Sequence, residues 1–366
     1  MIWRCDLVPQ YEAYRDEIHE AIERVLRSGR YILASEGAAL EREFADYIGV
    51  KHGVGLANAT DGLTLTLLAL GIKAGDEVIT TPFTAIPTVS AIIDAGATPV
   101  FVDVCADTFL MNVDKVAAAI TPRTKAIMPV HIFGNVLDVP RLREIAGPGI
   151  PIVEDASQSH GSTIRGRQSG SMADAGVFSF YPTKNLGAYG DGGMVVTNNP
   201  ELSDRLKLLR MYGMSDKDHI VINGVNSRLD ELQAAILRVK LKHLDAMNLS
   251  RVRIAERYRR ELRSDRFLHQ SIPDQVVSNY HVFVSRFRGE RAAFIRGMDA
   301  MQIQTNIYYL VPLHLQEANQ FLGYNSGDLP VAEALCEAVV ALPLFPELPQ
   351  GTLSHIIQTI NDWKSA

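Results

Sequence analysis

The sequence predicts an α/β protein with a mostly parallel, seven-stranded sheet and helices on both faces, followed by a smaller C-terminal α+β domain. The sheet is predicted from apolar runs that recur between residues 54 and 197, namely VGLA, EVITT, TPVFVDV, KAIMPV, IPIVED, GVFSF and GMVVT. Helical patterns separate these runs, for example from Asp61 to Leu70 and from Val89 to Ala95. Near-continuous apolar strands that alternate with helices are typical of a parallel sheet covered on both faces.

The C-terminal part begins with a long amphipathic helix, which we expect over Ser227 to Leu244. Its apolar residues recur at helical spacing: Leu229, Leu232, Ile236, Val239 and Leu244. Charged helical sequence continues to about residue 263. Beyond it, YHVFVSRF and IQTNIYYLV are strand-like, and Val331 to Val340 is helix-like. We therefore predict a large domain over residues 1–245 and a small domain over residues 246–366.

The charge balance points to small metabolites as ligands. The 366 residues include 36 basic and 42 acidic ones, a net charge of −6, so neither nucleic acid nor an anionic membrane is an expected partner. The N-terminal stretch MIWRCDLVPQYEAYRDEI carries charges throughout, so no secretory signal is expected. The three cysteines are widely separated, which predicts no disulfide framework and no metal site and fits a reducing cytoplasm.

The first candidate ligand-binding segment is ANATDGLTLTLLAL, where a strand runs into Asn58, Ala59 and Thr60 before a helix. In open α/β sheets, ligands bind beyond the carboxyl ends of the strands. The free amides and the dipole of this helix would hold a phosphate, helped by the Thr60 hydroxyl. The alternative is that Thr60 only caps the helix.

The second candidate segment is IPIVEDASQSHG, in which an apolar strand ends in Glu154 and Asp155, with Gln158 and His160 soon after. A fully buried aspartate is rare unless it is paired. Asp155 is therefore expected either to cap the next helix or to pair with a cationic group. The segment alone leaves both alternatives open.

The third candidate segment is FSFYPTKNLGAYGDGG, which places Lys184 between a strand and a glycine-rich stretch. The glycines are expected to let the backbone turn tightly beside a ligand. Desolvation at such a position lowers the pKa of a lysine and frees its amine as a nucleophile toward carbonyls. The commoner alternative is a surface lysine in a loop.

The three segments together meet the requirements of pyridoxal phosphate (PLP). A lysine forms the Schiff base, an aspartate keeps the pyridine nitrogen protonated so that the ring is an electron sink, and a helix N-terminus takes the phosphate. Asp155 and Lys184 are 29 positions apart, which leaves room for a helix and a strand between them. This spacing would place both residues at neighbouring points of one sheet edge.

The chain resembles the DegT/DnrJ/EryC1/StrS family of sugar aminotransferases, which have the aspartate aminotransferase fold (fold type I). The similarity covers nearly the whole chain, from DLVPQYEAYRDEI and SGRYILASEGAALEREFADYIGV to YYLVPLHLQ and ALPLFPELP. Between these motifs lie ITPRTKAIMPVHIFGN, VEDASQSHG, FSFYPTKN and NSRLDELQAAILRVKL. Matches of this length and order are highly specific.

The resemblance implies a role for each matching residue around the cofactor ring. Lys184 would be the lysine that binds the cofactor and carries a proton between substrate and cofactor. Asp155 would pair with the pyridine nitrogen, and Gln158 would lie beside the phenolic oxygen.

The resemblance also implies how the phosphate is bound. Ala59, Thr60 and Ser179 match the family's phosphate contacts. Asn226, in GVNSRLDE, matches the residue that reaches the phosphate of the neighbouring subunit's cofactor. A homodimer with shared active sites is therefore implied.

The sugar site is implied by a weaker similarity. FSFYPTKNLGAYGDGG is closer to members that aminate C3 of a nucleotide-linked 3-keto-6-deoxysugar than to members that act at C4. Tyr308, Tyr309 and His314, in IYYLVPLHL, match sugar-binding positions, although the residues alone equally describe a strand with core aromatics. Ala85 departs from the family, because relatives usually carry there an aromatic residue that stacks on the cofactor ring. Phe83 is the alternative stacking residue.

We therefore predict a PLP-dependent aminotransferase that moves an amino group from glutamate or glutamine to a nucleoside-diphosphate-linked keto-deoxysugar, at C3. Pyridoxamine phosphate (PMP) would be the cofactor form in the second half-reaction. The alternatives are a C4-aminotransferase, a PLP-dependent sugar dehydratase and a non-catalytic regulator. Lys184 argues against the dehydratase, which uses histidine in its place, and only Ala85 supports the regulator.

Overall fold

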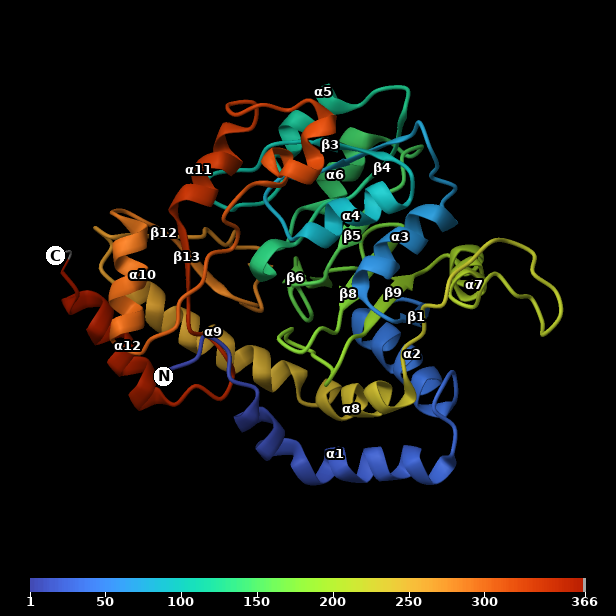
Figure 1. Cartoon of the computed structure of the whole chain (residues 1–366), viewed down its shortest axis with the longest axis horizontal. Coiled ribbons are helices and arrows are strands. Elements are labelled where there is room, and N and C mark those ends of the chain that lie inside the picture. Colours follow the sequence, from blue (N-terminus) through green and yellow to red (C-terminus); the bar gives the residue numbers. More distant parts are fainter. Residues whose placement is uncertain (365–366) are drawn as a thin grey trace.

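The computed structural model describes residues 1–364, and the predicted strands form its central layer (Figure 1). These strands are β1 (His52–Leu56), β2 (Glu77–Thr80), β3 (Thr98–Phe101), β4 (Thr124–Ile127), β5 (Val153–Asp155), β8 (Ala175–Ser179) and β9 (Gly193–Thr197). They pair as two sheets, β3-β2-β4 and β1-β9-β8-β5. Parallel bridges join Ile127 to Ile152 and Val130 to Asp155 at the β4–β5 boundary, so the seven strands are continuous as one layer.

The strand directions agree with the predicted, mostly parallel sheet. β2 is parallel to β3 and β4, and β5 is parallel to β8. Only β9 runs against its neighbours, β1 and β8. The chain passes from β8 to β9 without a helix, and such a direct connection produces antiparallel strands, because parallel strands need a crossover.

Helices cover both faces of the layer, as predicted. Cluster residues of α3 (Ala59–Ala69), α4 (Ile86–Asp94) and α7 (Pro200–Leu209) pack on one face. Cluster residues of α2 (Ser35–Ile48), α6 (Val139–Ala146) and α8 (Glu231–Leu241) pack on the other face. Alternate residues of a strand point to opposite faces, so Val177 packs toward α3 and Phe178 toward α2.

The N-terminus contributes a long helix, α1 (Val8–Ser28), which lies along α8 (Figure 1). The apolar side chains at this contact are Ile18, Ala21 and Val25 of α1 and Ala235, Ile236 and Val239 of α8. Before α1, Ile2 forms a parallel bridge with Ile303. The first residues of the chain therefore join its C-terminal part.

The C-terminal part combines an antiparallel sheet with helices. The sheet contains β10 (Phe267–His269), β12 (Phe283–Phe287) and β13 (Val339–Leu342) in that order. The helices are α9 (Leu244–Glu261), α10 (Arg291–Ala300), α11 (Pro330–Ala338) and α12 (Gln350–Asp362). The domain boundary at residue 246 stays a prediction, and this position lies inside α9.

Three predicted elements differ from the structure. The helix expected over Ser227 to Leu244 starts at Glu231 and is interrupted after Leu241, where α9 begins at Leu244. The apolar spacing continues across this interruption, so periodicity could not show it. Of IQTNIYYLV, only Ile303 and Asn306 form isolated β-bridges, to Ile2 and to Ala341. The last part of the predicted helix, from Val339, belongs to β13.

Short elements complete the chain. No helix lies between Asp155 and Lys184; that segment contains the short strands β6 and β7, which form a small sheet with β11 from the C-terminal part. Its strands are β6 (Thr163–Ile164), β7 (Arg167–Gln168) and β11 (Val276–Val277). The other short elements are α5 (Val116–Ala119), η1 (Val113–Lys115), η2 (Ile132–Gly134), η3 (Leu313–Leu315) and η4 (Glu317–Leu322).

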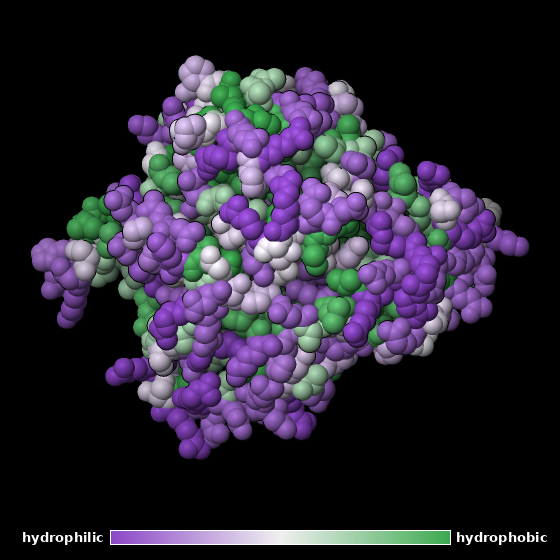
Figure 2. Space-filling model, turned by 180° about the vertical axis from the view of Figure 1, so that it is seen from behind, coloured by the Kyte–Doolittle hydropathy of each residue, from purple (hydrophilic) through white to green (hydrophobic). Residues whose placement is uncertain are grey.

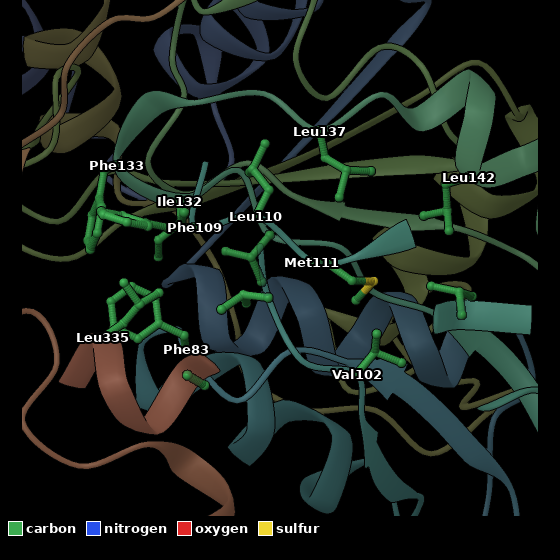
Figure 3. Close-up of a cluster of buried hydrophobic side chains, with 14 of the residues drawn as sticks. Phe83, Val102, Phe109, Leu110, Met111, Ile132, Phe133, Leu137, Leu142 and Leu335 are labelled. Atoms are coloured by element: carbon green, nitrogen blue, oxygen red, sulfur yellow. The ribbon is translucent and has the colours of Figure 1, made fainter. Parts of the chain in front are cut away.

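One buried cluster links the sheet to the C-terminal part. Leu335 of α11 lies in the same cluster as Phe83, Phe109 and Phe133 (Figure 3). Hydrophilic side chains cover much of the surface seen in Figure 2, with smaller hydrophobic groups between them. Among residues 1–364, no helix is both long enough and apolar enough to cross a bilayer.

Candidate active site

Strand register brings the three candidate segments to one edge of the sheet. Gly193 of β9 pairs with Leu56 at the end of β1 on one side and with Ser179 at the end of β8 on the other. Asp155, at the end of β5, pairs with Val177 of β8. The carboxyl ends of β1, β5 and β8 therefore lie at the same edge, where ligands bind in open α/β sheets.

Lys184 follows β8 in the loop that leaves this edge. Its backbone amide donates to Tyr181 O at 2.8 Å, which closes a turn. The residue keeps partial solvent exposure, but burial of the amine lowers the pKa of Lys184 from 10.5 to about 8, and the Asp155 charge opposes this change. The amine has no hydrogen bond or ion pair within residues 1–364. Lys184 therefore lies in a loop, as the alternative expects, but its amine is desolvated, and a larger fraction of it is neutral near pH 8 than in an ordinary lysine.

This lowered pKa predicts how the cofactor-free protein reacts with PLP. The neutral amine is the nucleophile, and its fraction grows as the pH rises through the pKa. We expect the initial rate of PLP attachment, followed by absorbance, to rise with pH and to level off above about 8. A rate that keeps rising toward the ordinary lysine pKa of 10.5 would contradict this expectation.

Asp155 is buried, with 5% of its surface exposed. Its Oδ2 accepts a hydrogen bond from Thr88 Oγ1 at 2.7 Å, and its Oδ1 accepts one from Ser157 N at 3.2 Å. No helix follows Asp155, so the capping alternative is wrong. The Asp155 charge acts on Lys184. Asp155 thus faces a cationic group at the sheet edge, and part of its accepting capacity remains free.

Glu154 is on the opposite side of the strand and has a structural role. Its carboxylate accepts the amides of Gly170, Met172 and Ala173 at 2.7–2.9 Å. It also lies 2.7 Å from His131 Nε2. Because Leu137 N donates to His131 Nδ1 at 3.2 Å, the ring proton is on Nε2 and is donated to Glu154.

The N-terminus of α3 is capped by Asn58 and not by Thr60. Asn58 Oδ1 accepts the Asp61 amide at 2.8 Å. Ala59 and Thr60 are the first two helical residues, so their amides have no partner within the helix. No other hydrogen bond occupies these amides within residues 1–364. The predicted phosphate site therefore has two free donors on a positive helix end.

The glycines after Lys184 serve close packing. Gly187, Gly190, Gly192 and Gly193 all lie outside the positive-φ region, so these glycines do not supply a left-handed turn. A Cβ on Gly193 would lie 2.4 Å from the carbonyl carbon of Asn58. Only glycine at this position lets β9 lie against the N-terminus of α3.

Gln158 and Tyr309 are brought together by the fold. Gln158 Oε1 accepts the Phe133 amide at 3.0 Å, and its Nε2 donates to Tyr309 Oη at 3.1 Å. The Tyr309 ring stacks near Phe133, with centroids 6.2 Å apart. Tyr309 therefore lies beside the residue predicted to contact the cofactor, although the two are far apart in sequence.

The stacking position shows what Ala85 and Phe83 can contribute. Phe83 is fully buried, with its ring edge-to-face against Phe109, Phe133 and Tyr309. It has no free face, so it cannot replace the missing stacking ring. Ala85 is partly exposed and precedes α4 directly.

Ala85→Tyr is expected to tighten cofactor binding. Ala85 lies three residues before Thr88, which contacts Asp155, so a ring there reaches the candidate site. A stacked aromatic pair contributes about 1 kcal/mol, or roughly a fivefold lower dissociation constant. Titration of the cofactor-free protein with PLP measures the constant. Unchanged or weaker binding would refute the idea.

Tyr308, His314 and Asn226 occupy different surroundings. Tyr308 lies next to Tyr309, with the Arg4 guanidinium 5.5 Å from its ring centre. His314 is buried, and its Nε2 lies 3.1 Å from Glu333 Oε1. None of the side-chain contacts of His314 or Asn226 is with Lys184, Asp155 or Gln158. Asn226 is exposed on a loop, so its assigned role requires a partner.

The sequence analysis did not assign a role to three residues near the candidate site: Thr88, His160 and His281. Thr88 orients Asp155 from α4. His160 is fully buried, both its ring nitrogens lack partners within residues 1–364, and burial lowers its pKa to about 3, with Lys184 adding to the effect. Burial lowers the pKa of His281 well below 6.5, and the charge of Lys184 lowers it further. Thr88 and His281 lie far from Asp155 and Lys184 in sequence, so spacing gave no signal.

The residues present fit PLP. The fit requires an amine for the aldehyde, a carboxylate for the ring nitrogen and donors for the phosphate. Lys184 has an amine without a partner, Asp155 has spare accepting capacity, and the amides of Ala59 and Thr60 are free. Lys184, Asp155 and these amides lie at one sheet edge, and their charges complement the cofactor.

Comparison with known proteins identifies close relatives. The chain is 44% identical over 359 residues to a dTDP-3-amino-3,4,6-trideoxy-alpha-D-glucose transaminase of Micromonospora megalomicea subsp. nigra, covering 96% of each chain. It is 41% identical over 370 residues to a pleiotropic regulatory protein of Geobacillus stearothermophilus, covering 98% of this chain and 97% of the relative.

Two solved structures share the fold. DesV of S. venezuelae, in complex with a ketimine intermediate, has a TM-score of 0.95 and 42% identity, over 98% of this chain and 97% of DesV. A sugar aminotransferase of Streptococcus pneumoniae in its PLP form has a TM-score of 0.89 and 30% identity, over 94% of this chain and 95% of that chain. The chain also matches the DegT/DnrJ/EryC1/StrS aminotransferase family over residues 12–361. With a lysine, an aspartate and a helix N-terminus at one sheet edge, the chain belongs to the DegT/DnrJ/EryC1/StrS aminotransferase family.

Proposed function

We propose that the protein is a PLP-dependent aminotransferase that moves an amino group from glutamate or glutamine to C3 of a nucleoside-diphosphate-linked keto-deoxysugar. One observation carries the proposal: Lys184, Asp155 and the free amides of α3 lie at one sheet edge. The C3 position is supported by the 44% identical relative, which is a transaminase of a 3-amino sugar. The three widely separated cysteines fit a cytoplasmic enzyme.

Each residue has a defined task in the proposed reaction. PLP, when bound, supplies an electrophilic carbon and an electron sink. Lys184 Nζ would take the proton from the α-carbon of the amino donor and deliver it to the cofactor's exocyclic carbon. Asp155, oriented by Thr88, would hold the proton on the ring nitrogen. With the keto sugar as acceptor, Lys184 would move the proton in the opposite direction.

The remaining residues would bind and orient the reactants. The amides of Ala59 and Thr60 and the Ser179 hydroxyl would hold the phosphate. Gln158 would face the phenolic oxygen, and its hydrogen bond to Tyr309 fixes its side chain.

The sugar-binding role of Tyr308, Tyr309 and His314 has uneven support. Tyr309 contacts Gln158, and Tyr308 is its neighbour in the chain, so these two are near the proposed cofactor site. His314 contacts Glu333 and lies among other aromatic rings. All three residues are part of the proposed sugar site.

A homodimer with shared active sites is part of the proposal. Asn226 is exposed and belongs to the segment between α7 and α8. Part of this segment projects from the body of the protein near α7 (Figure 1). Large apolar residues are exposed on the same segment and near the end of α1: Tyr31, Ile32, Leu33, Tyr212, Ile220, Val221 and Val225. Such exposed apolar groups are typical of an interface.

Mixing two inactive variants tests the shared site. If Asn226 serves the partner's site, a mixed dimer of Lys184→Ala and Asn226→Ala has one intact site and one site with both defects. We expect activity to return to about a quarter of the wild-type level after the subunits are mixed and exchanged, as random pairing of a two-fold dimer requires. Absence of recovery despite subunit exchange would contradict a shared site.

The proposed function is tested first by absorbance. We expect the band of lysine-bound PLP to convert to that of PMP when L-glutamate or L-glutamine is added without sugar. A panel of 3-keto and 4-keto nucleotide sugars then identifies the acceptor and separates C3 from C4 transfer. A spectrum that does not change with any amino donor would refute the aminotransferase function. It would favour a regulator, the role named for the Geobacillus relative.

A further inference from the structure

The loop that carries Lys184 leaves the sheet after β8, and hydrogen bonds hold its two ends together. Phe180 closes it at both ends, because its amide donates to Gly192 O at 2.8 Å and its carbonyl accepts the Ala188 amide at 2.7 Å. Residues 181–187 therefore form a compact loop whose orientation is set by whatever contacts it.

α8 holds this loop and the residue Tyr189 that follows it with two side chains, Lys240 and Gln233. Gln233 Oε1 accepts the Tyr189 amide at 2.8 Å, and its Nε2 donates to Tyr189 O at 3.4 Å. Lys240 Nζ donates to Gly187 O and lies 4.9 Å from the centre of the Tyr189 ring. The two side chains are seven residues apart, which is two helical turns, so they project from the same helix face.

A lysine at position 240 is unfavourable for stability, because its amine is buried. Its surface is fully buried, and burial lowers its pKa to about 8, with the Glu347 charge opposing this change. An apolar side chain of similar length would avoid the cost of burying a charge. What the lysine adds is a strong hydrogen bond to one backbone carbonyl and a cation–π contact.

Packing transmits the position of Gly187 to Lys184. A Cβ on Gly187 would lie 2.3 Å from Pro182 O and 2.9 Å from Tyr181 O, so the two sides of the loop are in direct contact. Tyr181 O in turn accepts the Lys184 amide at 2.8 Å. A shift of Gly187 therefore displaces the turn from Tyr181 to Lys184, and with it the backbone from which the Lys184 side chain projects.

We propose that Lys240 is a positioning residue that fixes the orientation of Lys184 by holding the Gly187 carbonyl, with Gln233 as a second, weaker anchor. The inference rests on the proposed function, because it assigns Lys240 to the proton transfers of Lys184. Displacement of a catalytic group by about 1 Å can cost 10²-fold in rate.

Lys240→Met tests the inference, because it keeps the stem of the side chain and removes the donor and the charge. Lys242→Met is the matched control, since Lys242 is an exposed lysine directly after α8. We expect K240M to lower the single-turnover rate with glutamate ten- to a hundred-fold per cofactor-loaded site, while the apparent affinity for glutamate changes less than about threefold. The isotope effect with α-deuterated glutamate should increase, because proton transfer becomes slower. K242M should behave as wild type.

Two further variants and one reaction without turnover complete the design. Lys240→Arg keeps a donor and should recover part of the rate, and Gln233→Leu should give a smaller loss than K240M. The rate of PLP attachment to the cofactor-free protein reports Lys184 without catalysis, and it should fall in the same order. If K240M does not fold, K240R and Q233L decide the question by the same readouts.

A purely structural role for Lys240 makes a different prediction. It would reduce stability and the number of loaded sites, but leave the rate per site and the isotope effect unchanged, and that result would overturn the inference. Failure of the proposed function is seen separately, as wild-type protein that does not react with any amino donor. In that case the PLP attachment rates of K240M and K242M still test the link between Lys240 and Lys184.

Discussion

Lys184→Ala is expected to abolish turnover while the protein stays folded. Lys184 is proposed both to bind the cofactor and to move the proton in each half-reaction, so its loss removes the general acid–base group. Such a group contributes about 10²–10⁴-fold to the rate. The loss of turnover should be at the upper end of this range or beyond, because both half-reactions are affected. Measurement of glutamate-dependent PMP formation gives the rate.

The fold should tolerate this change. The side-chain amine of Lys184 makes no hydrogen bond within residues 1–364, and the turn around it is closed by the backbone hydrogen bond from Lys184 N to Tyr181 O. Circular dichroism and the thermal midpoint should therefore remain close to wild type. Burial of a free amine is unfavourable, so a slightly higher midpoint is also compatible with this view.

Chemical rescue separates a lost proton carrier from a collapsed site. Added methylamine should restore part of the activity of K184A, because it can enter the vacated space and move the proton. Lys184→Arg should remain inactive, since guanidinium does not release a proton near neutral pH. Full turnover in K184A would refute the role assigned to Lys184.

Asp155→Asn is expected to cause the second-largest loss. An aspartate beside a cation favours its protonated form by one to three pKa units, which a neutral amide cannot do. One pKa unit corresponds to 1.36 kcal/mol, or tenfold in rate, so we expect a loss of about 10–10³-fold in turnover. The cofactor should still bind through Lys184 and the phosphate, although less tightly.

Thr88→Val is the matched control for Asp155. It keeps the carboxylate and removes the hydrogen bond that orients it, 2.7 Å from Thr88 Oγ1 to Asp155 Oδ2. We expect a loss of about tenfold, roughly the value of one hydrogen bond to a charged group. The spectrum of the bound cofactor should change in D155N and remain near wild type in T88V. Equal turnover in D155N and wild type would contradict the pairing with the ring nitrogen.

The fold was predictable wherever local sequence pattern and topology agree. Each of the seven apolar runs forms a strand because a strand buried on both faces needs continuous apolar sequence. The placement of Asp155 and Ser179 at one edge follows from the parallel pairing of β5 and β8. The family was also predictable, since its motifs, including those around Lys184, occur in order along nearly the whole chain.

Side-chain partners were not predictable to the same degree. Asn58 and Thr60 are both common capping residues, and only the backbone shows that Asn58 is the cap. Phe83 could have covered the cofactor ring, but three other rings bury it. The predicted helix from Ser227 is interrupted although its apolar spacing continues, because an interruption can leave the buried face unchanged.

The sequence by itself therefore determined the sheet, its covering helices and the family, and it predicted Lys184 and Asp155 as site residues, because these depend on local pattern and on residue chemistry. Only the tertiary structure decided which groups meet: Thr88 with Asp155, Gln158 with Tyr309, and Lys240 with the Lys184 loop. Such contacts join residues from separate elements, and the packing of those elements fixes their distance. Periodicity within one segment carries no information about that distance.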